Sequence, residues 1–162
     1  MSSVVTFRSG SESDTDRFSS ALAAAVSGGL VIALNGQLGA GKTRLVRGFC
    51  RSLGVGEDHV SSPTFVLMQL YTDGRIPIAH FDTYRLGDPE EFHAIGADEY
   101  LNSSEWLCLV EWADRVEEIL PEDHLTIRIA HTGETERLME VSSGGSVSSD
   151  VLSKLRMMLS SQ

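Results

Sequence analysis

The feature that most constrains this sequence is a glycine-rich segment between an apolar run and an amphipathic one. Residues 30–34 read LVIAL, which is typical of a strand covered on both faces. Residues 45–53 place apolar side chains at the spacing of one helix face. The segment between them matches G-x-x-x-x-G-K-[ST] with Gly36, Gln37, Leu38, Gly39, Ala40, Gly41, Lys42 and Thr43. A strand before this motif and a helix after it are the context in which it binds phosphate.

Each residue type in the motif has a chemical reason. Glycine allows a positive φ and brings backbone N–H groups close to an anion. A helix that begins near Lys42 directs its unpaired N–H groups and partial positive charge into the same space. Lys42 is one of only two lysines in the chain and supplies a full charge for β- and γ-phosphates, while the Thr43 hydroxyl can ligate Mg²⁺. The alternative, a glycine-rich turn that binds nothing, is disfavoured by the flanking strand and helix.

The sequence favours ATP over GTP. GTPases read guanine with an N-K-x-D motif, and the only other lysine, Lys154, lies in LSKLR near the end of the chain. The D-x-x-G motif of GTPases does not occur either. We therefore expect ATP and Mg²⁺ as cofactors.

Two acidic residues stand where a magnesium–nucleotide site needs them. Asp82 follows IPIAHF and Glu111 follows WLCLV, and both runs are apolar and strand-like. Open α/β sheets bind ligands at the carboxyl ends of their strands. We expect one of these carboxylates to hold the metal and the other to orient the attacking water, and the sequence leaves open which does which. The alternative is that each acid caps the helix that follows it.

Three further residues near the expected site have open interpretations. Thr64, in SSPTF, is a candidate for a loop that senses the γ-phosphate through Mg²⁺, although Pro63 alone would explain a turn there. Trp112 either packs near the nucleotide or belongs to the core. His80 lacks metal-ligand spacing to any other residue, and we assign it no role.

The order of elements predicts an α/β fold. We expect one domain over 1–162, with a mostly parallel central sheet, helices on both faces and a C-terminal antiparallel hairpin. The expected strands are residues 30–34, 64–71, 76–86, 106–112, 124–131 and 137–143. The expected helices are residues 15–26, 45–53, 88–101, 113–120 and 149–159.

Charge and cysteine content limit the partners and the compartment. Thirteen basic and twenty-three acidic residues give a net charge of −10, so contact with RNA needs a local basic patch or a partner protein. The acidity is equally explained by solubility alone. Cys50 and Cys108 lie far apart, outside any metal-binding spacing, as expected for free thiols in a reducing compartment. No run approaches the about 18 apolar residues of a membrane helix, and no signal peptide is apparent, so we expect a cytoplasmic protein.

Beyond the phosphate motif, the chain resembles the TsaE (YjeE) family, a group of bacterial P-loop ATPases of tRNA threonylcarbamoyladenosine biosynthesis. The resemblance rests on segments that follow one another in the family's order: GQLGAGKTRLVRGFCRSLG, VSSPTF, HFDTYRL, DPEEF…IGADEYL and LCLVEW. It implies slow ATP hydrolysis by the protein alone, and action with two partners, TsaD and TsaB, which modify the adenosine beside the anticodon. In that model the ATPase resets the TsaD–TsaB complex between turnovers, and its contact with tRNA is indirect.

The resemblance also carries roles onto individual residues. It places Thr64 in a switch loop and Asp82 and Glu111 in the metal and water site. It further implies that Thr15, in SDT, lies near the adenine and that Arg137, in GETER, lies near the nucleotide. The chain departs from the family at Gln37, where an acid is usual. The change removes a charge but keeps a hydrogen-bonding oxygen.

Two other functions remain open at this stage. A small-molecule kinase would use the same phosphate cradle, but no arginine-rich lid insertion is apparent between the strands. A nucleotide-binding module that docks a partner without productive turnover is compatible with the acidic surface and with Gln37.

Overall fold

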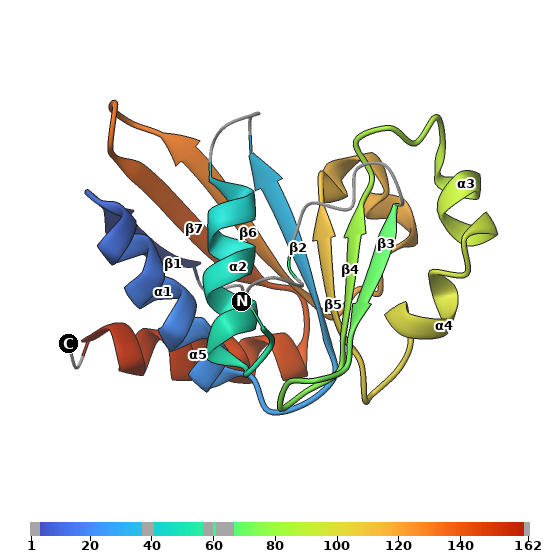
Figure 1. Cartoon of the computed structure of the whole chain (residues 1–162), viewed down its shortest axis with the longest axis horizontal. Coiled ribbons are helices and arrows are strands. Elements are labelled where there is room, and N and C mark those ends of the chain that lie inside the picture. The colour runs from blue at the N-terminus through green and yellow to red at the C-terminus, as the bar shows by residue number, and fades with distance from the viewer. Residues whose placement is uncertain (1–3, 37–40, 57–59, 61–66, 161–162) are drawn as a thin grey trace.

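A seven-stranded mixed sheet forms the centre of the protein, in the order β1-β7-β6-β2-β5-β4-β3 (Figure 1). The computed structural model describes residues 4–36, 41–56, 60 and 67–160. The strands are β1 (Val4–Ser9), β2 (Leu30–Gly36), β3 (Met68–Tyr71), β4 (Ile78–Asp82), β5 (Leu107–Glu111), β6 (His124–His131) and β7 (Arg137–Ser143). The four central strands β6, β2, β5 and β4 are parallel. Their carboxyl ends therefore meet at one edge of the sheet.

Antiparallel pairs complete the sheet on both sides. β6 and β7 form the expected C-terminal hairpin, and β1 pairs with β7 beyond it. β3 pairs antiparallel with β4 at the opposite edge. The predicted parallel centre and closing hairpin are thus confirmed, and the sheet has an antiparallel edge on the other side as well.

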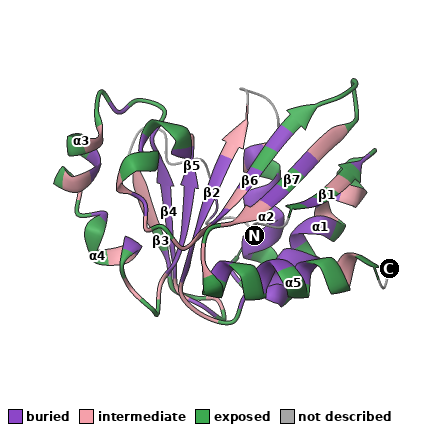
Figure 2. Cartoon of the chain, turned by 180° about the vertical axis from the view of Figure 1, so that it is seen from behind, coloured by how far each residue is buried: buried purple, intermediate pink, exposed green. Residues whose placement is uncertain are grey.

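Helices cover the two faces of the sheet unequally. The longer helices, α1 (Glu12–Ala25), α2 (Lys42–Ser52) and α5 (Ser146–Ser160), pack on one face, where Phe18 and Phe49 are fully buried. The opposite face of the central strands is covered by short elements around Phe92: α3 (Pro89–Ala94), α4 (Asp98–Leu101), and the 3₁₀ turns η2 (Ala113–Arg115) and η3 (Glu117–Ile119). Seen from behind, the central strands β2, β4 and β5 form the buried middle of the molecule (Figure 2).

Two sequence-based expectations for the elements need correction, and one strand was missed. The single helix expected over 88–101 is two short helices, because Gly96 between them has a φ of 86°. The helix expected over 113–120 is a pair of 3₁₀ turns. β1 was not predicted at all. Among the described residues, no helix is long and apolar enough to cross a membrane.

Candidate functional site

Lys42 lies at the centre of the candidate site, in the first turn of α2. Gly41 precedes it with a φ of 105°, and the helix N-terminus there has no side-chain cap. The Lys42 side chain is only 6% exposed. Its Nζ donates to the carbonyl of Gly36 at 2.5 Å and lies 3.8 Å from the centre of the Trp112 ring. Burial lowers the pKa of Lys42, and the opposing negative charges of Glu111, Asp82 and Asp114 do not fully offset this.

The two predicted carboxylates lie side by side next to this lysine. Asp82 ends β4 and Glu111 ends β5, and the two are register partners in the parallel pair. Their exposed fractions are 3% and 2%. Asp82 Oδ1 accepts from the backbone N–H of Tyr84 at 2.9 Å. The hydroxyl of Thr83 donates to the carbonyls of Glu111 at 3.0 Å and Trp112 at 2.6 Å, which ties the two strand ends together.

Trp112 is neither a core residue nor a free surface aromatic. It is half-buried and adopts a left-handed conformation, with a φ of 59°, directly after Glu111. The Lys42 ammonium lies over the Trp112 ring. The ring also contacts the ring of Tyr84, with 4.8 Å between the two centroids. The ring therefore forms one wall of the space around the lysine.

His80 belongs to the site, although the sequence analysis assigned it no role. Its side chain is fully buried, and Nε2 lies 2.6 Å from Glu111 Oε2. Its Nδ1 lies 2.9 Å from the Tyr71 hydroxyl, which donates to Gln69 Oε1 at 2.8 Å. One signal could have revealed it: alternation along a strand places His80 and Asp82 on the same face of β4.

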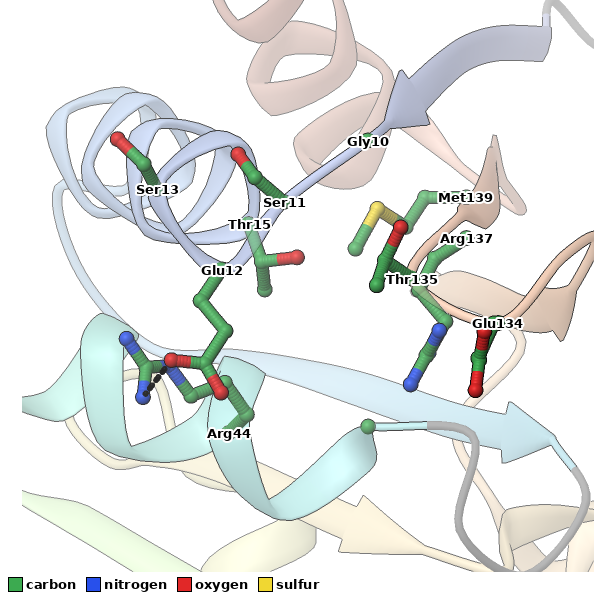
Figure 3. A pocket seen from close by; sticks show the side chains of 11 residues that line it. Gly10, Ser11, Glu12, Ser13, Thr15, Arg44, Glu134, Thr135, Arg137 and Met139 are labelled. Atoms are coloured by element: carbon green, nitrogen blue, oxygen red, sulfur yellow. Dashed lines mark ion pairs between the residues drawn. The ribbon is translucent and has the colours of Figure 1, made fainter.

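A cavity of about 640 Å³ adjoins the start of α2 (Figure 3). Thr15 and Arg137 lie on opposite walls, from α1 and β7, so the two residues expected near the nucleoside share one cavity. Thr15 is buried and bonded to Ser9, with 2.8 Å between the hydroxyl oxygens. A Cβ added to Gly41 would lie 3.7 Å from Arg137 Nε, so the arginine reaches the phosphate motif. The volume falls within the range of small-molecule sites, about 300–1,000 Å³.

The described residues fit a magnesium–nucleotide complex. A positive-φ glycine at an uncapped helix N-terminus suits a phosphate group, and the buried Lys42 adds a full positive charge. Thr43 is half-buried in the same turn. Within the described part of the chain no three His, Cys, Asp or Glu side chains form a metal cluster. Mg²⁺ is usually held by one or two carboxylates together with substrate phosphates, and Asp82 and Glu111 provide two buried carboxylates here.

Several predicted residues fall outside the described part of the chain. These are Gln37, Leu38, Gly39, Ala40 and Thr64. The described site therefore consists of Gly36, Gly41, Lys42, Thr43, Asp82, Glu111, Thr15 and Arg137, together with His80 and Trp112.

Comparison with known proteins identifies the family. The family model described as threonylcarbamoyl adenosine biosynthesis protein TsaE matches residues 9–139. Three similar proteins carry the name tRNA threonylcarbamoyladenosine biosynthesis protein TsaE. The Bacillus subtilis protein is 45% identical over 67% of this chain and 66% of its own length. The Haemophilus influenzae protein is 42% identical over 62% of this chain and 62% of its own length. The Treponema pallidum protein is 40% identical over 74% of this chain and 86% of its own length.

The matches to the first two relatives thus span less than two thirds of those proteins, whereas a structural match spans nearly all of both chains. The crystal structure of YdiB from Bacillus subtilis superimposes with a TM-score of 0.81 at 32% identity, covering 97% of each chain. This likeness supports the same arrangement of sheet and helices. On these findings, the chain belongs to the TsaE family of threonylcarbamoyl adenosine biosynthesis proteins.

Proposed function

We propose that this protein is a Mg²⁺-dependent ATPase that acts in threonylcarbamoylation of the anticodon-adjacent adenosine of tRNAs reading A-starting codons. Its ATP hydrolysis would drive turnover of a TsaD–TsaB complex. The observation that carries the proposal is the convergence of one buried lysine and two buried carboxylates. Lys42 comes from the start of α2, and Asp82 and Glu111 come from the ends of neighbouring parallel strands.

Each residue of the site would have a separate role in phosphoryl transfer. Bound Mg-ATP would supply the hydrolysable γ-phosphoryl group and the metal charge that stabilises its transfer. Lys42 would move from the Gly36 carbonyl to the phosphates, where its positive charge offsets their negative charge. Thr43 and one of the two carboxylates would hold the metal. The other carboxylate would accept a hydrogen bond from the attacking water and fix its direction toward phosphorus.

The cavity beside α2 would hold the nucleoside. Thr15 presents a hydroxyl there, and Arg137 adds a positive charge between the cavity and Gly41. A nucleotide placed with its phosphates at Lys42 would extend its sugar and base into this space. Sequestration between α1, α2 and β7 would orient it for transfer.

The proposed partners are TsaD and TsaB, and the contact with tRNA would be indirect. The net charge of −10 opposes binding to a phosphate backbone. Arg44 and Arg51 on α2 offer little to RNA, because both pair with Asp16 of α1. The two cysteines, Cys50 and Cys108, are free and buried, which accords with a reducing compartment such as the cytoplasm.

The test is phosphate release from ATP, measured for the protein alone and with TsaD and TsaB. We expect partner-stimulated release that falls about 100-fold or more in Lys42→Ala and in Glu111→Gln, the range for losing a charge-stabilising group or a catalytic base. Two exposed residues provide matched controls, Lys154→Ala on α5 and Glu105→Gln before β5, and both variants should keep the wild-type rate.

The other functions predict different outcomes. Stoichiometric transfer of phosphate to a metabolite would indicate a kinase. Tight ATP binding without hydrolysis, alone and with both partners, would contradict the ATPase and indicate a docking module.

A further inference from the structure

We propose that His80 is a positioning residue that holds the Glu111 carboxylate in its working orientation, and that β3 supports it through Tyr71 and Gln69. The inference rests on the proposed function, because it concerns the carboxylate that would hold the metal or orient the water. It assigns a role to a buried histidine that is not among the residues lining the cavity beside α2.

The geometry of the contact is close and fully enclosed. His80 Nε2 and Glu111 Oε2 are 2.6 Å apart, and their side chains are 0% and 3% exposed. A short contact between buried groups of this kind is a charge-assisted hydrogen bond, in which the imidazole N–H donates to the carboxylate. Only one oxygen of Glu111 is engaged in this way. The other oxygen, Oε1, would serve the chemistry of the site.

The histidine is itself held from the other side. Tyr71 and Gln69 lie on the edge strand β3, and the Tyr71 hydroxyl donates to Gln69 Oε1. The same hydroxyl oxygen lies 2.9 Å from His80 Nδ1, within hydrogen-bond distance. The ring is thus fixed at both nitrogens. Side chains from β3, β4 and β5 form one continuous chain of hydrogen bonds that ends on Glu111.

A histidine that only filled the core would not need this arrangement. Its neighbour on the same face of β4, Ile78, is a fully buried apolar residue, and an apolar side chain could occupy the place of His80 as well. Partners that orient a metal-binding or catalytic group through such bonds typically affect affinity or activity by about 10–100-fold. The hydrogen bonds that run from Gln69 through Tyr71 to His80 would orient Glu111 in this way.

Two substitutions of His80 test the roles of its two ring nitrogens independently. In His80→Gln the amide nitrogen can replace Nε2 and still donate to Glu111. In His80→Asn the shorter amide can replace Nδ1 and reach Tyr71, but it cannot reach Glu111. The two variants have similar polarity, so they differ mainly in the contact that the proposal concerns.

The first experiment measures two quantities for each variant. One is the turnover number in the presence of TsaD and TsaB, and the other is the dissociation constant for ATP in the absence of metal. We expect His80→Asn to lower kcat by about 10–100-fold while the ATP dissociation constant changes less than about twofold. His80→Gln should recover most of the lost rate. Thermal unfolding of each variant shows whether it is folded. Tyr71→Phe removes the hydrogen bonds to Gln69 and His80 but leaves the one between His80 and Glu111, so it should have an intermediate rate.

The second measurement needs no nucleotide. In ¹H–¹⁵N NMR of the free protein, a slowly exchanging, downfield imidazole Nε2–H signal should be present in the wild type. It should disappear in His80→Asn. The loss in His80→Asn assigns the signal to His80, because His93 and His124 also have hydrogen-bonded ring nitrogens and are unchanged in that variant.

The outcomes distinguish this inference from the proposed function. Turnover by wild type with an equal rate in folded His80→Asn, or equal losses in the Asn and Gln variants, would overturn the role of His80 alone. Absence of turnover in the wild type would overturn the proposed function, and the inference would fail with it. Absence of the imidazole signal would overturn the hydrogen bond itself.

Discussion

At the scale of single residues, the site depends on opposing electrostatic effects around Lys42. Burial disfavours its charged form, whereas Glu111, Asp82 and Asp114 favour it. The Lys42 ammonium donates to the Gly36 carbonyl and lies over the Trp112 ring. These partners are weaker than a phosphate group, so in the proposed function the lysine would exchange them for the nucleotide without leaving a buried charge unpaired.

The burial of the two cysteines predicts that their thiols react slowly. Both side chains are fully buried, and burial raises the pKa of Cys50 and of Cys108 to about 12. For Cys50 the nearby negative charge of Asp73 adds to the effect. We expect neither thiol of the folded protein to react with a chromogenic disulfide reagent at pH 8, because the thiolate is the reactive form.

Denaturant supplies the control for this prediction. In urea both thiols should react, because exposure returns the pKa toward the ordinary value of 9.0. Rapid reaction of a thiol in the folded protein would show that the core around that cysteine is open.

The sequence predicted single residues well where one strand end was enough to place them. Asp82 and Glu111 each follow an apolar run, and parallel strands bring such ends together, as the structure shows. His80 was missed because its partners come from β3 and β5, 9 and 31 residues away in the chain. Spacing within one segment carries no information about contacts of that kind.

At the scale of elements, α5 depends on an acid that lies outside the helix. Asp123, just before β6, accepts from the backbone N–H groups of Val147 at 2.9 Å and Ser148 at 3.0 Å. The Ser148 hydroxyl donates to it as well, at 2.6 Å. These bonds satisfy N–H groups that the helix itself leaves unpaired.

Removal of this cap should destabilise the protein. Asp123→Ala should lower the free energy of unfolding by about 1 kcal/mol, within the usual range for helix caps. For a chain of this size the loss corresponds to a fall in Tm of about 2–4 °C. Asp123→Asn keeps one carbonyl oxygen and should lose less, whereas the exposed neighbour variant Glu122→Ala should match the wild type.

The same cap also predicts how stability depends on pH. Partial burial of Asp123 disfavours its charged form, but the bonds from Ser148 and Val147 and the charge of His124 outweigh this and lower its pKa below 3.8. The stabilising effect is therefore complete above pH about 4 and is lost as the pH falls through the lower folded value. A wild-type advantage over Asp123→Ala that stays constant down to pH 2 would contradict this account.

Helices and strands were predicted correctly where the pattern of apolar residues within one segment determines them. They were not predicted where contacts with distant parts of the chain determine them. The β6–β7 hairpin has alternating residues on both sides of a short turn, and its predicted strands agree with the structure. β1 was missed because its partner, β7, lies more than 120 residues away, so its pairing has no local signal in the sequence. The segment 88–101 has helical spacing throughout, but Gly96 divides it.

At the scale of the whole molecule, the fold brings the functional groups to one edge of the sheet. The parallel strands β2, β4 and β5 end together there, and α2 begins there. The cavity between α1, α2 and β7 opens beside the same edge. The overall charge is −10, yet Lys42 and Arg137 supply positive charge where phosphates would bind. In the proposed function a nucleotide would bind at this edge, whereas the net negative charge of the whole protein disfavours non-specific binding to nucleic acid.

The central claim is that ATP hydrolysis at this site drives repeated rounds of tRNA modification. It is tested most directly by counting threonylcarbamoyladenosine formed per TsaD–TsaB complex, with an excess of tRNA and with wild-type protein or Glu111→Gln. Glu111→Gln preserves the size of the side chain but removes its charge, so nucleotide binding should persist while hydrolysis stops. We predict many products per complex with the wild type and about one with Glu111→Gln. Many rounds with Glu111→Gln, while its ATP hydrolysis is abolished, would contradict the claim.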